Sequence, residues 1–201
     1  MTANTIEYFY AAHSAYAYLG TKALAQIAQD SGWRVVHRPF DYLPVVQAAS
    51  PHVIQGRTVA HIEYFFGREL RRWSQWRDLP MISRRPTHHD NPLALASGMI
   101  IAATDPDRVG FAILQAHWRD DADIADADTL LQIAQECGED AQALLKMARS
   151  TAVSEQFSAN TKEAIARSVF GSPTYFVGGD MFYGQDRLEL VARAIKQPFD
   201  P

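Results

Sequence analysis

Ser14 occupies a position in the sequence where a side chain could do chemistry. Residues 6–10 form a short segment rich in aromatic and β-preferring side chains, as a buried strand is, and residues 19–27 repeat apolar side chains at helical spacing. Ser14 ends the polar joint between them, so we expect it at a helix N-terminus, where free N–H groups and a partial positive charge attract anions. Its hydroxyl could donate a hydrogen bond to such an anion, or act only as an N-cap.

The histidines of the sequence do not by themselves indicate a catalytic base or a metal site. His13 precedes Ser14, but adjacency in the chain does not place its ring against the hydroxyl. Serine without a base is a poor nucleophile, so the predicted role of Ser14 is that of a hydrogen-bond donor. His88, His89 and Asp90 lie on one predicted loop, where neighbouring histidines rarely point at one ion and no third ligand is evident. We therefore predict a polar loop there, and no metal.

The composition is that of an ordinary globular protein. The 201 residues are 47% hydrophobic and 21% charged, which allows one large domain or a small domain with a large insertion. The formal net charge of −4 comes without a basic run, and no apolar stretch could cross a bilayer, so neither a nucleic-acid nor a membrane partner is expected. Residues 1–7 show no signal-peptide pattern, so a cytoplasmic location is expected. The one cysteine, Cys137, excludes an internal disulfide and dithiol chemistry.

The secondary-structure signals occur in the order β-α-β, then a long helical block, then β-β-α. After the first strand and helix, residues 33–38 alternate apolar and polar side chains, which predicts a second, parallel strand. Near the other end, residues 173–177 and 181–183 flank a Gly-Gly-Asp turn and predict a hairpin. Residues 188–195 predict a final helix. The two ends of the chain are therefore expected to share one sheet.

Local signals predict several helix starts and one apolar helix face. Asp105 and Asp126 are predicted N-caps, and Pro92 is predicted to begin a helix. Asp186 and Glu189 have the spacing of a capping box at the start of the final helix. One apolar stripe is expected on a helix that carries Ile62, Phe65, Phe66, Leu70 and Trp73.

Two motifs resemble those of known proteins. Residues 14–20, Ser-Ala-Tyr-Ala-Tyr-Leu-Gly, resemble the start of the first helix in DsbA-type thiol-disulfide oxidoreductases, where a Cys-x-x-Cys precedes Tyr-Leu-Gly. Ser14 stands where the first cysteine would be, and Ala17 where the second would be. Residues 170–177, Phe-Gly-Ser-Pro-Thr-Tyr-Phe-Val, resemble the loop whose proline is cis and faces the active site in thioredoxin-fold proteins.

With Gly-Gln-Asp-Arg-Leu at residues 184–188 and the segment 87–95, the whole chain resembles the 2-hydroxychromene-2-carboxylate isomerases, which are relatives of kappa-class glutathione transferases. The fold expected from the element order and the resemblance is α/β and thioredoxin-like (β-α-β … β-β-α) with a large all-helical insertion. Residues 1–50 and 168–201 would form the thioredoxin-like domain, and residues 51–167 the insertion.

The resemblance implies a glutathione-dependent isomerase that acts on a small aromatic substrate. The hydroxyl of Ser14 would hold the glutathione thiolate, which adds reversibly to 2-hydroxychromene-2-carboxylate so that trans-o-hydroxybenzylidenepyruvate forms after bond rotation. The family pattern has a lysine at the glutathione carboxylates, whereas this chain has none between Ala23 and Leu145, and Arg57 or His61 would replace it. The other implied glutathione contacts are Ser172, Pro173, Gln185 and Asp186, and the implied substrate contacts are Tyr16, His89 and Asn91.

The resemblance also implies a homodimer. Two other functions stay open at this point. A kappa-like glutathione transferase would share the thiolate site and differ in keeping the adduct. A redox-inactive thioredoxin-fold module would bind a peptide or a partner along the loop that contains Pro173.

Overall fold

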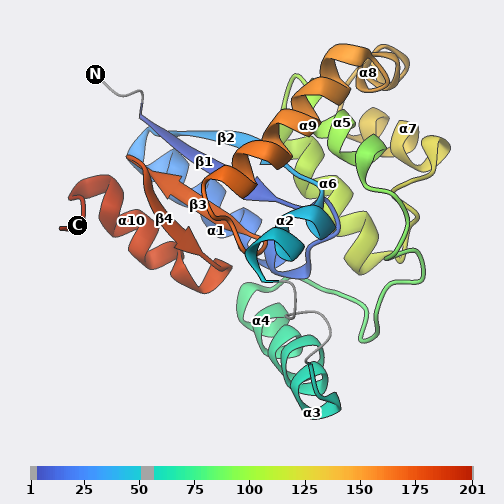
Figure 1. The fold of residues 1–201 in the computed structure, drawn as a ribbon. Helices are drawn as coiled ribbons and strands as arrows, with labels where there is room; N and C mark the ends of the chain where they lie inside the picture. The colour runs from blue at the N-terminus through green and yellow to red at the C-terminus, as the bar shows by residue number, and fades with distance from the viewer. Residues whose placement is uncertain (1–3, 51–56, 201) are drawn as a thin grey trace.

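A four-stranded mixed sheet joins the two ends of the chain (Figure 1). The central strand β1 (Thr5–Tyr10) pairs in parallel with β2 (Arg34–Pro39) and antiparallel with β3 (Thr174–Val177). A tight turn connects β3 to β4 (Asp180–Tyr183), so the strand order is β2-β1-β3-β4. The predicted β-α-β and β-β-α halves therefore complete one sheet, as a thioredoxin-like fold requires.

This computed structural model describes residues 4–50 and 57–200. No helix within those ranges is long and apolar enough to cross a membrane. The helical elements are α1 (Ala15–Ser31), α2 (Tyr42–Ala49), α3 (Val59–Ile62), the π-helix η1 (Glu63–Glu69), α4 (Leu70–Arg77), α5 (Ala94–Ala102), α6 (Pro106–Arg119), α7 (Ala127–Glu136), α8 (Ala141–Ala148), α9 (Thr151–Ala166), the 3₁₀ turn η2 (Gln185–Arg187) and α10 (Leu188–Lys196).

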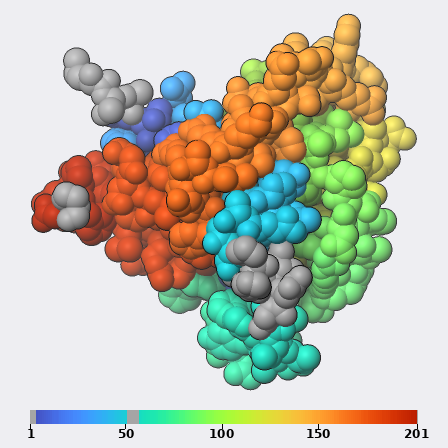
Figure 2. Space-filling model, in the orientation of Figure 1, coloured from blue at the N-terminus to red at the C-terminus, as the bar shows by residue number. Residues whose placement is uncertain are grey.

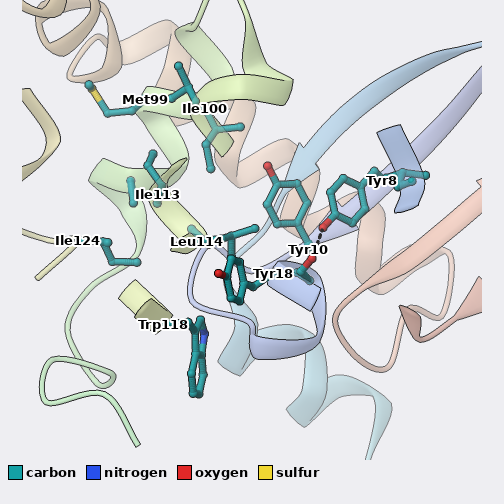
Figure 3. Packing of buried hydrophobic residues seen from close by; sticks show 14 of the residues in the cluster. Tyr8, Tyr10, Tyr18, Met99, Ile100, Ile113, Leu114, Trp118 and Ile124 are labelled. Atoms are coloured by element: carbon teal, nitrogen blue, oxygen red, sulfur yellow. Dashed lines mark hydrogen bonds between the residues drawn. The ribbon is translucent and has the colours of Figure 1, made fainter. Parts of the chain in front are cut away.

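Alternation along the strands gives the sheet two apolar faces. Tyr8, Tyr10 and Tyr175 are fully buried on the face covered by α1, α6 and α10, and Figure 3 shows Tyr8 and Tyr10 side by side in this cluster. The rings of Tyr8 and Tyr10 stack with their centroids 4.1 Å apart. Phe9 and Phe176 point to the other face and pack in a smaller cluster with residues of α2 and α9. Because both faces are covered, the residues that follow β1 are held by packing on either side.

A hydrogen-bonded chain ties the strands to α6. The Tyr10 hydroxyl lies 2.8 Å from Nδ1 of His37, and Nε2 of His37 lies 2.8 Å from a carboxylate oxygen of Asp107. A carboxylate only accepts, so His37 donates from Nε2. Its Nδ1 then accepts a hydrogen bond from the Tyr10 hydroxyl. Gly110 on α6 makes this approach possible, because a Cβ there would lie 2.7 Å from the Tyr10 oxygen.

The segment α3–η1–α4 projects from the rest of the molecule (Figures 1 and 2) and corrects the predicted apolar stripe. Leu70 is buried, but Ile62, Phe65 and Phe66 are each more than 40% exposed. The π-helix η1 has a wider turn than an α-helix, so side chains three and four residues apart do not stay on one face through it. The periodic pattern was wrong about burial here, because it assumed an unbroken α-helix lying on the core.

Other local predictions can be compared directly with the structure. Asp105 and Asp126 each cap a helix by accepting from the third residue on, as predicted. The helix expected to begin at Pro92 begins at Ala94 without a side-chain cap. The capping box at Asp186 was wrong: this residue lies inside η2, and its carboxylate pairs with Arg187.

The close approach at Gly110 generates a stability prediction. Gly110→Ala is expected to lower the free energy of unfolding by about 1–3 kcal/mol, because the new methyl group meets a buried, hydrogen-bonded tyrosine oxygen that cannot move away cheaply. Urea unfolding followed by circular dichroism measures this. Gly67→Ala is the matched control: nothing lies within 4 Å of the added Cβ, so helix propensity should raise stability by up to about 1 kcal/mol. Equal unfolding free energies for the two variants would contradict the packing account.

Candidate functional site

Ser14 connects the start of α1 to the loop before β3. Its Oγ accepts from the N–H of Ala17 at 3.2 Å, as an N-cap does, and its hydroxyl donates to the carbonyl of Ser172 at 3.2 Å. In return, Oγ of Ser172 accepts from the N–H of Ala11 at 3.0 Å. The peptide bond between Ser172 and Pro173 is cis. Two serines far apart in the sequence therefore fix each other at one edge of the sheet.

The N-terminus of α1 presents hydrogen-bond donors without partners. Within the described residues, the N–H groups of Ala15 and Tyr16 make no backbone hydrogen bond, as expected for the first turn of a helix. The first turn also contains no acidic side chain that would cancel the positive end of the helix dipole. Together with the hydroxyl of Ser14, which is only half-buried, these donors suit an anionic group such as a thiolate or a carboxylate.

Aromatic side chains border one side of this helix start. The Tyr16 hydroxyl donates to the carbonyl of Phe65 at 2.8 Å and so ties η1 to α1. Tyr183 packs so closely against Gly171 that a Cβ there would lie 2.4 Å from its ring. Partial burial raises the pKa of Tyr183, Tyr42 adds to the rise, and the positive charge of Arg57 opposes it. Sequence reasoning missed Tyr183, because a tyrosine in a hairpin strand carries no signal of what its ring covers.

Arg57 supplies a cation near this aromatic side. Its guanidinium lies over the Phe66 ring, 5.2 Å from the centroid. None of the described carboxylates forms an ion pair with it. His61, the other predicted replacement for the family lysine, packs against Phe65 with the ring planes 57° apart and is exposed. Arg57 is therefore the better placed of the two to meet a carboxylate.

Gln185 and Asp186 occupy different environments. Gln185 is 1% exposed, and its side-chain oxygen accepts from Arg77 Nη2 at 3.1 Å, while its Nε2 is buried without a partner. Gly20 of α1 lets it come this close, since a Cβ there would lie 2.8 Å from that of Gln185. Asp186 is exposed and pairs with Arg187. Asp186 is thus open to a ligand, whereas Gln185 is held under α1 by Arg77, a residue that sequence reasoning missed.

Three histidine rings form a row that begins at His13, the residue before Ser14. The His13 and His89 ring centroids are 4.5 Å apart, and Nδ1 of His89 lies 3.0 Å from Nε2 of His117. Burial lowers the pKa of His13, and with the contributions of the two other histidines that pKa is about 3. Burial and then His117 lower the pKa of His89 to about 4. His117 was missed by sequence reasoning, because it reaches the row from the far end of α6.

Not all of the residues predicted on this loop belong to the histidine row. Asn91 donates to a carboxylate oxygen of Asp123 at 2.8 Å, and His88 lies 3.5 Å from the same carboxylate, so both side chains anchor the loop. Asp90 pairs with Arg85 at the surface. Of this loop, His89 alone among the predicted residues belongs to the histidine row. Across the described ranges there is no group of three or more histidine, cysteine or acidic side chains arranged to hold a metal ion.

Cys137 lies outside the site. It follows α7, its Sγ lies 3.8 Å from the carbonyl of Arg108, and it is 8% exposed. Burial raises the pKa of its thiol, and Arg108 opposes that rise. A buried thiol with a raised pKa is a poor nucleophile, so Cys137 acts as a packing residue.

The buried histidines generate a prediction for stability against pH. Unfolded histidines titrate near 6.5, whereas His13 and His89 stay neutral in the folded protein down to about pH 3 and 4. Between these values the unfolded chain binds more protons, so the free energy of unfolding should fall as the pH drops from about 6.5 to 4. His89→Phe should make this decline shallower by about 1–3 kcal/mol.

Urea midpoints measured from pH 7 to 4.5 test this. His61→Phe is the matched control, because His61 is exposed on α3, and it should leave the decline unchanged. The same slope in the wild type and in His89→Phe would contradict the neutral, buried state of the row.

Comparison with known proteins places these features in a family. Residues 5–196 match the DSBA-like thioredoxin domain. A curated 2-hydroxychromene-2-carboxylate isomerase from Pseudomonas sp. (strain C18) is 24% identical over 193 residues, which is 94% of this chain and 89% of the relative. One from Sphingobium xenophagum is 26% identical over 93% of this chain and 95% of its own length.

Solved structures give the same fold. A 2-hydroxychromene-2-carboxylate isomerase superposes with a TM-score of 0.77 at 22% identity, covering 96% of this chain and 95% of its own. The cytosolic disulfide reductase DsbM from Pseudomonas aeruginosa, determined with GSH, gives a TM-score of 0.63 at 17% identity and covers 96% and 93%. The sheet order, the helix start at Ser14 and the matched range thus agree: the chain belongs to the family of DSBA-like thioredoxin domains.

Proposed function

We propose that this protein is a glutathione-dependent isomerase of the 2-hydroxychromene-2-carboxylate type. The observation that carries the proposal is the hydroxyl of Ser14 at the N-terminus of α1, beside free N–H groups and opposite the carbonyl of Ser172. Curated relatives that match over nearly the whole chain carry the name of this isomerase, which supports the choice of reaction.

The donor set at Ser14 fits a glutathione thiolate. Bound glutathione would supply a nucleophile that adds to the conjugated double bond of the substrate and leaves again after bond rotation. For this the hydroxyl of Ser14 has to turn from the Ser172 carbonyl to the sulfur, while its Oγ continues to cap Ala17. The hydrogen bond and the helix dipole both favour the charged sulfur over the neutral thiol.

Arg57 and Ser172 are the proposed anchors for the remainder of glutathione. The side chain of Arg57 forms no ion pair with the described carboxylates. It lies over the Phe66 ring, and its positive charge acts on Tyr183. The carbonyl of Ser172, released by the turning of the Ser14 hydroxyl, can accept from a peptide N–H beside Pro173. Asp186 is exposed and could receive the amino group of the γ-glutamyl end. Gln185 contributes by holding this turn to α4 through Arg77.

The proposed substrate side lies between Tyr16 and the histidine row. Tyr16 follows Ser14 in the first turn of α1, and the His89 ring lies 4.5 Å from that of His13, which precedes Ser14, so the proposal places an aromatic substrate ring between them. Asn91 acts indirectly, since its amide holds the loop that carries His89 to Asp123. A homodimer, which follows from the resemblance, and a cytoplasmic location, which the cytosolic relative DsbM supports, complete the proposal. The proposal also keeps the predicted domain division, with one domain formed by residues 1–50 and 168–201 and an insertion formed by residues 51–167.

Calorimetric titration with glutathione tests the site. Wild-type protein should bind at millimolar or lower concentration, and Ser14→Ala should weaken binding by about tenfold or more, because a hydrogen bond to a charged group contributes about 1.5–3 kcal/mol. Ser154→Ala is the matched control: Ser154 is an exposed serine on α9, and its substitution should leave the affinity unchanged. Loss of the N-cap also costs about 1 kcal/mol of stability, so unfolding of Ser14→Ala is measured in parallel.

The absorbance of the chromene substrate then distinguishes the remaining functions. An isomerase continues to turn over with glutathione present in catalytic amount. Consumption of one glutathione per substrate would indicate the transferase instead. Absence of glutathione binding at millimolar concentration would contradict both the isomerase and the transferase. It would favour a redox-inactive binding module.

A further inference from the structure

The three-histidine row, His13, His89 and His117, has no acid–base role in the proposed function so far, although His13 directly precedes Ser14. Its members come from three segments: the joint before α1, the loop before α5 and the end of α6. The His89 and His117 rings stack with centroids 5.2 Å apart, and His89 also packs edge-on against Trp118. Trp118 in turn donates from Nε1 to the carbonyl of His13 at 2.8 Å. The row is therefore fixed to the residue that precedes Ser14.

Hydrogen-bond chemistry decides the tautomer of His117. Its Nδ1 lies 3.3 Å from the carbonyl oxygen of Ala122, and a carbonyl can only accept. Nδ1 of His117 must therefore carry the proton. Burial lowers the pKa of His117, so its ring is neutral near pH 7 and its Nε2 has a free lone pair.

The tautomer of His89 follows from that of His117. Nδ1 of His89 lies 3.0 Å from Nε2 of His117, which can only accept, so Nδ1 of His89 carries the proton. In a neutral ring the other nitrogen is then bare. Among the described residues nothing donates to Nε2 of His89, and the side chain is only half-buried. Of the ring nitrogens of His89 and His117, only Nε2 of His89 therefore has no hydrogen-bond partner among the described residues.

We propose that His117 holds His89 as the Nδ1–H tautomer, and that the bare Nε2 of His89 takes the proton from a hydroxyl group of the substrate. The inference rests on the proposed function and adds an acid–base residue to it. His89 would be the catalytic residue and His117 a positioning residue that acts through it.

The proposed reaction contains a proton transfer that suits this nitrogen. When the cyclic hemiketal opens, the bond between its carbon and the ring oxygen breaks with both electrons going to that oxygen. The hydroxyl O–H electrons form the ketone, and the released proton goes to Nε2 of His89. The imidazolium then returns the proton to the phenolate oxygen, so no net proton is gained or lost. A neutral imidazole whose other nitrogen is already committed can perform both transfers.

The groups around His89 keep it neutral before the reaction. His13 and His117 face it from two sides, and the positive charge of Arg85 disfavours a further proton. Asp90 acts in the opposite direction, but its carboxylate is tied to Arg85. Since the pKa of His89 in the free protein is about 4, the acid limb of the kcat/KM profile is expected near pH 4 and not near the ordinary histidine value of 6.5.

Long-range ¹H–¹⁵N correlation spectra of labelled wild-type protein at pH 7 test the tautomers without any substrate. His89 and His117 should both show a protonated Nδ1 and a bare Nε2, with signals assigned by their loss in His89→Phe and His117→Phe. A protonated Nε2 on His89 would overturn the inference.

Kinetics test the catalytic role. His89→Phe keeps a ring of similar shape and should lower kcat by about 100-fold, while the glutathione affinity measured by calorimetry, which also reports folding, stays within about threefold. His117→Phe frees His89 to change tautomer and should lower kcat by about tenfold, with His89 then shifting toward a protonated Nε2 in the spectra. Ser154→Ala is the control, since Ser154 is exposed on α9 outside the site, and it should keep kcat unchanged.

The outcomes distinguish a failure of the proposed function from a failure of the acid–base role of His89. Wild-type protein that neither binds glutathione nor turns over the chromene overturns the proposed function and the acid–base step with it, whatever the tautomers. Wild-type protein that turns over, together with an unchanged kcat in His89→Phe, overturns only the role of His89.

Discussion

The reciprocal hydrogen bonds between the Ser14 joint and the Ser172 loop are the constraint on which the site depends. Ala11 donates to Oγ of Ser172 at 3.0 Å, and Oγ of Ser14 donates to the carbonyl of Ser172 at 3.2 Å. β1 and β3 pair antiparallel directly behind these residues, so the sheet delivers the two loops to the same edge. Without this contact the start of α1 would still be a helix N-terminus, but the loop that contains Ser172 would not be held opposite it.

Much of this arrangement could be predicted from local sequence, and the part that could not is non-local. The strands, the helix start at Ser14 and the caps at Asp105 and Asp126 each follow from a few neighbouring residues, and the structure confirms them. His117 joins His89 only because α6 packs against α1 and α5, which no spacing in the sequence reveals. Arg77 meets Gln185 across 108 positions for the same reason.

Two errors of sequence reasoning, at the apolar stripe and at Asp186, have one physical cause, which is that helices do not always keep the α-helical hydrogen-bond pattern. The segment 63–69 widens to a π-helix and turns Phe65 and Phe66 outward. Residues 185–187 tighten to a 3₁₀ turn, so Asp186 cannot take the position of an N-cap. Both deviations occur where the chain borders the candidate site, since Tyr16 binds the carbonyl of Phe65 and Asp186 lies exposed beside α1.

The serine at the helix start also bears on how the protein responds to oxidants. A hydroxyl oxygen cannot form a disulfide, so a small thiol that reaches Ser14 can leave without a reductant to release it. The one thiol of the chain, Cys137, is buried after α7 with a raised pKa, and so it is protected from exchange. One solved relative of this fold is a disulfide reductase, whereas Ser14 offers this chain no thiol at the helix start and Cys137 is buried.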